Sequence, residues 1–209
     1  MPENKGLLIV TGVGKDYDQR SVLRDVSFSV GIGESMVIAG ANGSGKSTLL
    51  RILCGLTAPS SGQVIWRAPE GNLNPTQMLR GLGYLSPEVG LYERLSAFEH
   101  LQVFSRLRGL SKGHRELSAT LERFGLGDAM HRAVGEFSSG MKQRVKLALA
   151  TIHSPRVLLL DEPGSNLDED GRQLVREIIG EVVQRGLVLV ATNETQEVAE
   201  YGQTVLRLG

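Results

Sequence analysis

A stretch of nine residues, Gly40-Ala-Asn-Gly-Ser-Gly-Lys-Ser-Thr48, constrains the fold more than any other part of this chain. It fits the phosphate-binding loop pattern, whose fixed positions here are Gly40, Gly45, Lys46 and Ser47. Glycine suits such a loop because the backbone must close around a phosphate with several N–H groups turned inward. The Lys46 ammonium supplies a charge for the β- and γ-phosphates, and the Ser47 hydroxyl is placed to bind Mg²⁺.

The segments on either side of the loop supply the context that it requires. Ser35–Ala39 reads as a short buried strand, and the apolar residues after the loop recur at helical spacing, at Leu49, Leu50, Ile52 and Leu53. The loop therefore opens a helix, whose N-terminal dipole favours an anion. A glycine-rich turn that merely precedes a helix is the alternative, and the ordered strand, loop and helix disfavour it. The sequence predicts that this chain binds a nucleoside triphosphate.

The composition limits the other partners. The 23 basic and 23 acidic residues balance, so no sequence-wide positive field recruits nucleic acid, and we expect no nucleic-acid partner. No apolar run approaches the ~20 residues that span a bilayer. We therefore expect a soluble, cytoplasmic chain unless a partner holds it at a membrane. The single cysteine, Cys54, suits a reducing compartment and a buried, inert thiol.

The order of the expected elements indicates the fold class. The first third reads mainly as strands, and the middle is helical, with a capping-box signal at Ser96. In the last third, the apolar runs Val157–Leu160 and Leu187–Ala191 flank a helix from about Asp170 to Gln184. Buried strands that alternate with helices argue for a parallel sheet covered by helices. The sequence therefore predicts a sheet-based nucleotide core that is interrupted by a helical insertion.

An acidic pair follows the first of these two apolar strands. Asp161 ends the apolar run, and Glu162 comes next. Ligands bind beyond the carboxyl ends of strands in open α/β sheets, so an aspartate there can reach Mg²⁺ at the mouth of the phosphate loop. A glutamate beside it can act as general base by polarising the attacking water. A solvated loop is the alternative for the pair alone, but the presence of the phosphate loop favours the catalytic interpretation.

A second helix start completes a recognisable pattern. The segment Phe137-Ser-Ser-Gly-Met-Lys-Gln-Arg144 places Ser138, Ser139, Gly140 and Met141 at a helix N-terminus, with exposed N–H groups and a positive dipole end. In this order, before the strand of Asp161, it resembles the signature motif of the ATPase subunits of ABC transporters. The resemblance implies that this helix end contacts the γ-phosphate held by the other subunit of a head-to-tail dimer. Taken alone, Ser-Ser-Gly would be an ordinary helix cap.

The resemblance covers essentially the whole chain and implies its architecture. We expect one ABC ATPase domain over residues 1–209, with an α/β fold of the P-loop NTPase type. Its nucleotide-binding core, a RecA-like parallel sheet with an N-terminal antiparallel β-subdomain, would comprise residues 1–86 and 155–209. The helical subdomain would comprise residues 87–154.

The resemblance also implies roles for individual residues. Tyr17 would stack on adenine, although a strand-end tyrosine on the surface is the alternative, and Asp168 would communicate between the two sites of the dimer. The candidate ATP-binding residues are Tyr17, Gly40, Asn42, Gly43, Gly45, Lys46, Ser47 and Thr48. The candidate catalytic residues are Glu162, Lys46 and Asn193, and the candidate Mg²⁺ ligands are Ser47, Asp161 and, in addition, Glu88.

Three departures from the family pattern concern residues near the phosphates. Ser139 and Met141 replace a glycine and the glutamine of the usual signature. Pro87 and then Glu88 follow the strand 83–86, where the family has a glutamine that senses Mg²⁺ and the attacking water and couples to the membrane partner. Glu88 is a candidate substitute for that glutamine.

The third departure is Asn193, which stands where the family's switch histidine is expected. An asparagine can still donate an amide N–H to a γ-phosphate, but it cannot carry a proton or a positive charge. We therefore hypothesise that hydrolysis is retained, because Glu162 is intact, but is slower than in relatives with histidine.

These features favour the energy-coupling ATPase of an ABC membrane transporter. The resemblance implies two copies, as a homodimer, that sandwich two ATP molecules, and a transmembrane permease that reads their motion through a groove near Glu88 to Ser96. The chain would then be peripheral at the inner face of the cell membrane. The signature segment and Ala191-Thr-Asn193 are most similar to exporter ATPases of the cytochrome c maturation, haem-handling group.

A soluble ABC ATPase associated with translation or DNA repair is the alternative function. Translation factors of that kind normally carry two cassettes on one chain, and this chain has one phosphate loop. Repair ATPases insert long coiled coils between the phosphate loop and the signature, where this chain has no heptad run. A kinase or GTPase fits less well, because the signature segment is present and the Asn-Lys-x-Asp guanine-reading element is absent.

Overall fold

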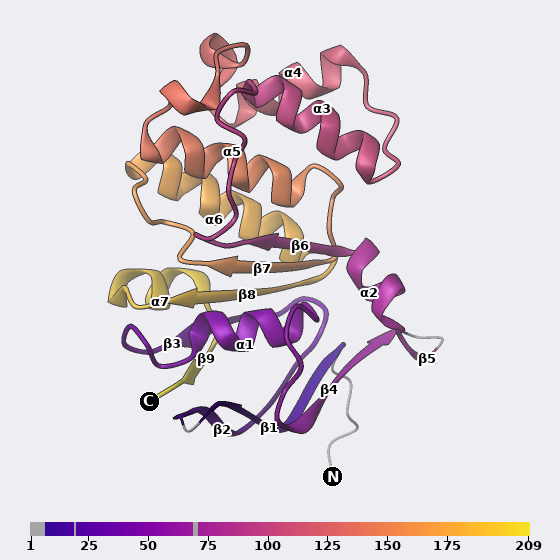
Figure 1. The fold of residues 1–209 in the computed structure, drawn as a ribbon, viewed down its shortest axis with the longest axis vertical. Helices are drawn as coiled ribbons and strands as arrows, with labels where there is room; N and C mark the ends of the chain where they lie inside the picture. The colour runs from indigo at the N-terminus through magenta and orange to yellow at the C-terminus, as the bar shows by residue number, and fades with distance from the viewer. Residues whose placement is uncertain (1–6, 19, 69–70) are drawn as a thin grey trace.

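Two β-sheets, one antiparallel and one parallel, organise the fold (Figure 1). The computed structural model describes residues 7–18, 20–68 and 71–209. The antiparallel sheet has the strand order β2-β1-β4-β5. Its strands are β1 (Leu8–Tyr17), β2 (Arg20–Val30), β4 (Ser61–Ala68) and β5 (Gly71–Asn72).

The parallel sheet has the strand order β6-β7-β8-β3-β9, and every neighbouring pair in it runs parallel. Its strands are β3 (Ser35–Ala39), β6 (Leu82–Leu85), β7 (Val157–Asp161), β8 (Leu187–Thr192) and β9 (Thr204–Arg207). Every residue of β3, β7 and β8 is buried. These are the strands that the apolar runs predicted, because a strand covered on both faces has no polar side to show.

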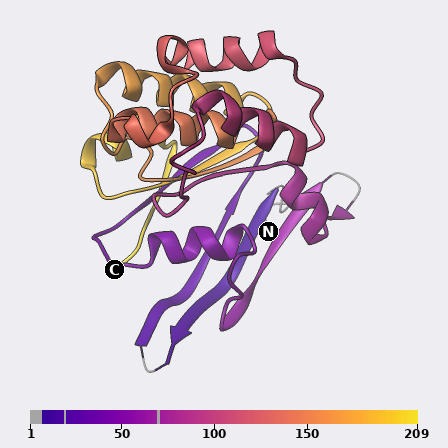
Figure 2. The same ribbon diagram turned by 45° about the horizontal axis from the view of Figure 1, so that its top comes forward.

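Helices cover both faces of the parallel sheet. α1 (Lys46–Leu53) lies between the two sheets, and α5 (Ser139–Thr151) and α6 (Glu169–Val183) lie on the opposite face (Figure 1). α3 (Ala97–Leu107) and α4 (His114–Arg123) lie beyond them. Figure 2 shows the antiparallel strands extending away from these helical layers. Shorter helices are α2 (Pro75–Arg80), α7 (Thr195–Tyr201) and the 3₁₀ turns η1 (Gly127–Ala129) and η2 (Val134–Glu136).

Alternate side chains of the central strands enter two separate cores. On β7, Leu158 and Leu160 pack into the core formed with the helices α3 to α6, whereas Leu159 packs into the core around α1. The second core continues through α1 to the inward side chains of β1 and β2. The period-2 alternation of a strand therefore joins the helical layers and the antiparallel sheet to one central sheet.

The observed architecture agrees with the expected α/β fold, a parallel sheet core with an antiparallel β-subdomain and a helical insertion. The capping box at α3 is present, because Ser96 and Glu99 bond to each other's backbone N–H. Cys54 is buried, and burial raises the pKa of its thiol, in agreement with an inert residue. The domain division at residues 87 and 155 stays a proposal, and residues 1–6, 19 and 69–70 of it lie outside the described residues.

Some elements were not expected from the sequence. β9 is an edge strand whose residues are largely exposed, so it lacks the apolar run by which β7 and β8 were found. α2 and α7 are each shorter than two full turns, and such short helices show little periodicity. None of the helices in the described part of the chain has the length and apolarity needed to span a bilayer.

Candidate nucleotide-binding site

The carboxyl ends of the central parallel strands meet at one edge of the sheet. β3 pairs with β8 through Ala39 and Thr192, and β7 pairs with β8 through Asp161 and Ala191, the last residue pair in each case. The phosphate loop, the acidic pair and the loop after β8 therefore start from the same edge. This is the edge at which open α/β sheets bind their ligands.

Two glycines of the phosphate loop are required by its geometry. Gly45 precedes α1 with a φ of 99°, and a Cβ there would lie 2.6 Å from Leu23 Cδ2. A Cβ on Gly40 would lie 2.6 Å from the carbonyl oxygen of Leu208. A larger residue at either position would displace the loop from β2 or from the backbone that follows β9.

Lys46 is held inside the loop. It is 5% exposed, and its Nζ donates to the carbonyl oxygens of Gly40 at 2.8 Å and Ala41 at 3.1 Å. A buried ammonium needs such partners, because leaving it unpaired is costly. The charge is thus fixed beside the N–H groups that begin α1, which suits the predicted contact with phosphates.

A cavity of about 420 Å³ opens over the loop. Its lining contains Val22, Pro87 and more than half of the candidate site residues. The candidate residues in the lining are Asn42, Gly43, Gly45, Lys46, Ser47, Thr48, Glu88, Asp161 and Glu162. Gly40 lies outside this lining, and its carbonyl oxygen accepts the hydrogen bond from Lys46 Nζ. The structure therefore brings the phosphate loop, the acidic pair and Glu88 together in one cavity.

Tyr17 lies at the end of β1, outside the lining of this cavity. Tyr17 is 43% exposed, and Lys15 Nζ lies 4.9 Å from the centroid of its ring, which is a cation–π contact. This is the surface position considered above for a strand-end tyrosine. Stacking on adenine stays a prediction for this residue.

Asp161 has the environment expected of a metal ligand. It is 1% exposed, and neither carboxyl oxygen has a partner of good hydrogen-bond geometry among the described residues. Burial raises the pKa of Asp161, and the nearby Ser47 hydroxyl lowers it again in part. A buried carboxylate beside a hydroxyl fits Mg²⁺, which proteins hold with one or two such oxygens while phosphates supply others.

Glu162 follows in a conformation that is rare for residues other than glycine. Its φ is 50°, and its N–H donates to the Ala191 carbonyl oxygen at 2.8 Å. Glu162 also lines the cavity. From the other side, Gln143 of α5 donates its side-chain amide to the carbonyl oxygens of Glu162 at 3.3 Å and Pro163 at 3.1 Å. The backbone that carries the candidate base is therefore held by both β8 and α5. Strain of this kind is typical of functional positions.

The segment with Pro87 and Glu88 is tied to the two helices that flank it. Glu88 forms an ion pair with Arg51 of α1, and Lys146 of α5 donates to the Pro87 carbonyl oxygen at 2.8 Å. Glu88 is thus neutralised by an arginine on the phosphate-loop helix. An unpaired carboxylate at this place would repel a triphosphate.

The signature residues begin α5 away from the cavity. Ser138 is the N-cap, and its hydroxyl accepts the N–H of Met141 at 3.2 Å. The ordinary helix cap considered above is therefore present, and it leaves the N–H groups of Ser139 and Gly140 without helical partners. A Cβ on Gly140 would lie 2.7 Å from the Asn166 carbonyl oxygen, so α5 begins directly against the loop 162–168.

Asp168 ends that loop as the N-cap of α6. Its carboxylate accepts the N–H of Gly171 at 2.9 Å and a bond from Arg144 Nη2 at 2.6 Å. These bonds, that of Gly171 first, lower the pKa of Asp168. Because Arg144 belongs to α5, Asp168 links the acidic loop to the signature helix.

Asn193 contacts the phosphate loop from the end of β8. Its Nδ2 donates to Asn42 Oδ1 at 3.0 Å. Asn42 lines the cavity, whereas Asn193 is not among the residues that line it. The residue at the switch position is therefore bonded to the loop that would hold the phosphates.

Comparison with known proteins agrees with the fold and the site, which together define a P-loop nucleoside triphosphatase. The ABC transporter family model matches residues 23–165. The lantibiotic transport ATP-binding protein SrtF of Streptococcus pyogenes is 34% identical over 195 residues, covering 93% of this chain and 83% of SrtF. The chain therefore belongs to the family of ABC transporter ATP-binding subunits, and it is an ATPase.

Two further relatives refine this placement. The cytochrome c biogenesis ATP-binding export protein CcmA of Cupriavidus necator is 32% identical over 188 residues, covering 90% of this chain and 83% of CcmA. A solved ATP-binding subunit of an ABC transporter superposes with a TM-score of 0.84 at 31% identity, covering 97% of this chain and 85% of that one. The likeness thus extends over the antiparallel sheet, the helical insertion and the parallel core.

Several residues at this site were not identified from the sequence. Arg51 lies four residues after Ser47, on the same face of α1, and that spacing was the available signal. Gln143 belongs to the signature segment, and nothing local marks it as a partner of Glu162. Glu197 of α7, a buried carboxyl behind the acidic loop, carried no signal in the sequence.

Proposed function

We propose that this chain is the ATP-hydrolysing, energy-coupling subunit of an ABC-type exporter. One observation carries the proposal: the phosphate loop, Asp161 and Glu162 share a cavity, but the signature residues 138–141 lie outside it. A helix end with free N–H groups that does not face its own nucleotide is available to a nucleotide held by another subunit. A head-to-tail dimer would complete two such sites.

The proposed mechanism assigns each polar group of the cavity a task. Lys46 and the N–H groups of the loop bind the β- and γ-phosphates, and Ser47 and Asp161 would hold Mg²⁺. The metal, when bound, neutralises charge that develops on the phosphates. Glu162 polarises the attacking water as general base, and Asn193 donates an amide N–H towards the γ-phosphate. Of these groups, Glu162 is the one whose removal should leave binding intact while it stops turnover.

The Glu162→Gln variant tests both the base and the dimer. We expect it to bind ATP with Mg²⁺, to hydrolyse it at least about 100-fold more slowly, and to elute as a dimer in size-exclusion chromatography only when ATP is present. Glu177→Gln, a change on the exposed surface of α6, is the matched control. Undiminished turnover in the Glu162 variant would exclude its role as base, and a monomer with bound ATP would exclude the shared site.

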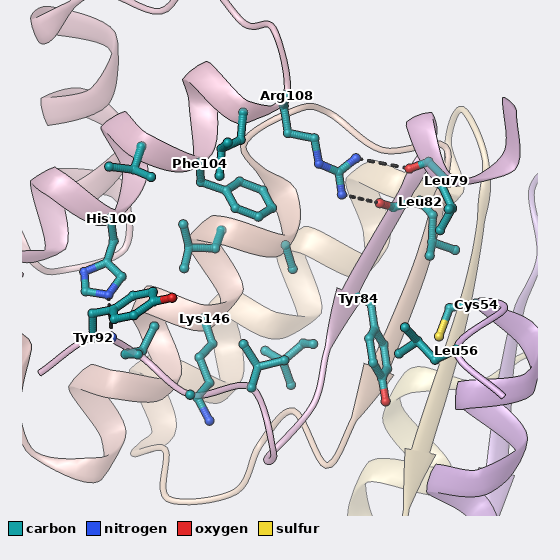
Figure 3. Close-up of a pocket in the computed structure, with 18 of the residues that line it drawn as sticks. Cys54, Leu56, Leu79, Leu82, Tyr84, Tyr92, His100, Phe104, Arg108 and Lys146 are labelled. Atoms are coloured by element: carbon teal, nitrogen blue, oxygen red, sulfur yellow. Dashed lines mark hydrogen bonds between the residues drawn. The ribbon is translucent and has the colours of Figure 1, made fainter. Parts of the chain in front are cut away.

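An apolar groove beside the nucleotide cavity provides the proposed surface for a transmembrane permease (Figure 3). It encloses about 430 Å³ between β6, α3, α5 and the loop after β6. Its lining includes apolar residues that are well exposed: Leu56, Leu79, Val89, Tyr92, Val103 and Leu107. A contiguous apolar patch of this kind marks an interaction site, and a groove of this shape suits an amphipathic helix.

The groove and the nucleotide cavity share one chain segment. Residues 87 and 88 line the cavity, and residues 89 to 92 continue directly into the wall of the groove. Lys146, which holds the Pro87 carbonyl oxygen, also lines the groove. A change at the nucleotide would therefore reach the permease through a few residues of continuous backbone. This supports the groove expected near Glu88 to Ser96 as the place of coupling.

Co-purification from a detergent-solubilised membrane tests the transport function. We expect a stoichiometric membrane protein to accompany the wild type and to be lost from Leu107→Glu, which places a charge in the groove. Ile32→Glu, at an exposed apolar residue outside the groove, is the control that should retain the partner. Recovery of ribosomes or DNA in place of a membrane protein would favour the soluble ABC ATPase.

The relatives support an exporter function, but they do not agree on one cargo. The SrtF and CcmA names refer to lantibiotic transport and to cytochrome c biogenesis export. The narrower haem and cytochrome c assignment is supported by one relative at 32% identity and by two short strings of residues. We therefore propose the exporter ATPase as the function, with a homodimer peripheral at the inner face of the membrane, and cytochrome c biogenesis as the cargo class to test within it.

A further inference from the structure

A buried carboxyl lies behind the candidate catalytic loop and has no task in the mechanism above. Glu197, in the first turn of α7, is 2% exposed, and neither of its oxygens has a partner of good hydrogen-bond geometry among the described residues. Tyr201, one turn later on α7, is also 2% exposed, and its hydroxyl is likewise unpartnered. Buried polar groups are normally bonded, so such a cluster requires an explanation.

The surroundings of Glu197 are the two loops that leave β7 and β8. A Cβ on Gly164 would collide with Glu197 Oε1 and lie 3.8 Å from the Tyr201 hydroxyl, so only glycine allows the loop 162–168 to approach this closely. Burial raises the pKa of Glu197, while the Thr192 side chain and the Gly164 backbone N–H stabilise its charged form in part. The carboxyl therefore lies between Gly164 and Thr192.

These two contacts are each one or two residues from a candidate catalytic group. Gly164 is two residues after Glu162, and Thr192 immediately precedes Asn193. Thr192 Oγ1 also accepts the N–H of Glu194 at 3.0 Å, which fixes the start of α7 against the same side chain. The loop of Glu162 is held on its other side by Gln143 of α5. On the side of α7, the Glu197 carboxyl contacts this loop at Gly164.

We propose that Glu197 is a positioning residue for ATP hydrolysis, whose carboxyl fixes the distance between the loop of Glu162 and the loop of Asn193. The carboxyl lies against the Gly164 backbone and beside the Thr192 side chain, and α7 holds it at the spacing that places base and amide around one γ-phosphate. This inference rests on the proposed role of Glu162. Removing the carboxyl would leave the phosphate loop, Lys46 and Asp161 in place.

A kinetic separation follows, because misplacement of the base affects turnover and not nucleotide affinity. Glu197→Leu should lower kcat about tenfold, since displacement of a catalytic group by a fraction of an ångström is costly. Glu197→Gln retains one acceptor oxygen and should lower kcat by about threefold. The KM for ATP should change less than about twofold in both. Glu200→Gln, on the exposed side of the same helix and paired with Arg176, is the control and should match the wild type.

The opposite side of the contact gives an independent test. Gly164→Ala should lower kcat as Glu197→Leu does, because the added methyl group collides with the carboxyl. Combining Gly164→Ala with Glu197→Asp shortens the acid by one methylene and should recover part of the lost turnover. Such non-additivity is expected only of groups that touch. The double variant remains informative if Glu197→Leu fails to fold.

The measurements are steady-state phosphate release, ATP binding by equilibrium fluorescence, and thermal melting of each variant. Lower melting temperatures with unchanged kcat in Gly164→Ala and Glu197→Gln would overturn the proposal and leave Glu197 with a purely structural role. A kcat loss without recovery in the double variant would also overturn it. If Glu162→Gln hydrolyses ATP at the wild-type rate, the proposed function fails instead, so the two failures are distinguishable.

Discussion

The nucleotide cavity and the apolar groove are of nearly the same size, about 420 and 430 Å³, yet they are built in opposite ways. The cavity is lined mainly by short runs of consecutive residues, 42–43, 45–48, 87–88 and 161–162. The groove combines the run 89–92 with side chains from several separate elements, as distant in sequence as Cys54 and Ala150. Binding a phosphate uses the backbone of one loop, whereas an apolar surface uses any side chain that packing brings there. The phosphate-binding part of the cavity is local in sequence, and the groove is not.

The largest effect that separates the two sites is expected from Lys46→Ala. Its Nζ is the cation fixed inside the phosphate loop, so its loss should reduce ATP hydrolysis by at least about 100-fold. The groove is unaffected, and co-purification of the membrane partner should persist. Phosphate release and the pull-down measure the two sites separately, and Lys112→Ala, at a partly exposed ion pair outside both sites, is the control. Loss of the partner together with ATP hydrolysis would show that the two sites are not independent.

A smaller effect is expected where the two sites meet, at the ion pair between Arg51 and Glu88. Arg51→Glu would place two uncompensated carboxylates near the phosphates and should weaken ATP binding by about tenfold. Glu88→Arg in the same chain should restore most of the affinity, because the pair is rebuilt in reverse. Titration of the three variants with a fluorescent ATP analogue checks this. Equal affinities in all three would mean that the pair is only a surface contact.

A pH effect is expected on the scaffold behind the groove and not at the nucleotide edge. His153 is bonded through Nε2 to the Leu82 carbonyl oxygen at 3.0 Å, and burial, helped by Arg108, lowers the pKa of His153 to about 4. The unfolded chain, with a histidine pKa near 6.5, binds more protons between these values. The free energy of unfolding is therefore unaffected by His153 titration above about pH 6.5. It decreases as the pH falls from there towards 4, because the unfolded chain takes up the proton first.

The His153→Gln variant isolates this contribution, since glutamine keeps a donor for Leu82 but does not titrate. The wild type should lose about 1 kcal/mol more stability than the variant between pH 7.5 and 5, a figure already reduced for partial exposure. Urea unfolding at the two pH values measures the difference. The same loss in both proteins would assign the pH dependence to other groups.

The smallest effect is expected at the switch position. Replacing Asn193 by histidine restores a group that can carry a proton, and turnover should rise about two- to threefold. Lys46, Asp161 and Glu162 are unchanged, so ATP affinity should stay constant. A fall in the turnover rate would contradict the hypothesis that Asn193 slows hydrolysis. It would instead show that the Asn193–Asn42 hydrogen bond is the arrangement this chain needs.

The candidate nucleotide-binding site shows which features could be predicted from the sequence and which could not. The strands β3, β7 and β8 and the loops after them were expected because apolar runs and glycine spacing depend on neighbouring residues. Arg51, Gln143 and Glu197 were not expected, because each acts on a loop that is distant from it in sequence. The groove was expected only as a place near residues 88–96. Its lining from α3, α5 and β6 required the packed structure.

By itself, the sequence determined the ligand-holding chemistry: a glycine loop with Lys46 and Ser47, an acidic pair at a strand end, and a capped signature helix. These follow from local rules, since a loop, a strand end and a helix start each bring their own N–H groups and charges. Only the tertiary structure decided that the signature helix lies outside its own cavity, and that Glu88 pairs with Arg51. It also decided that the Glu197 carboxyl lies directly against Gly164. Such relations depend on the register of a parallel sheet and on packing between layers, and neither is set by neighbouring residues.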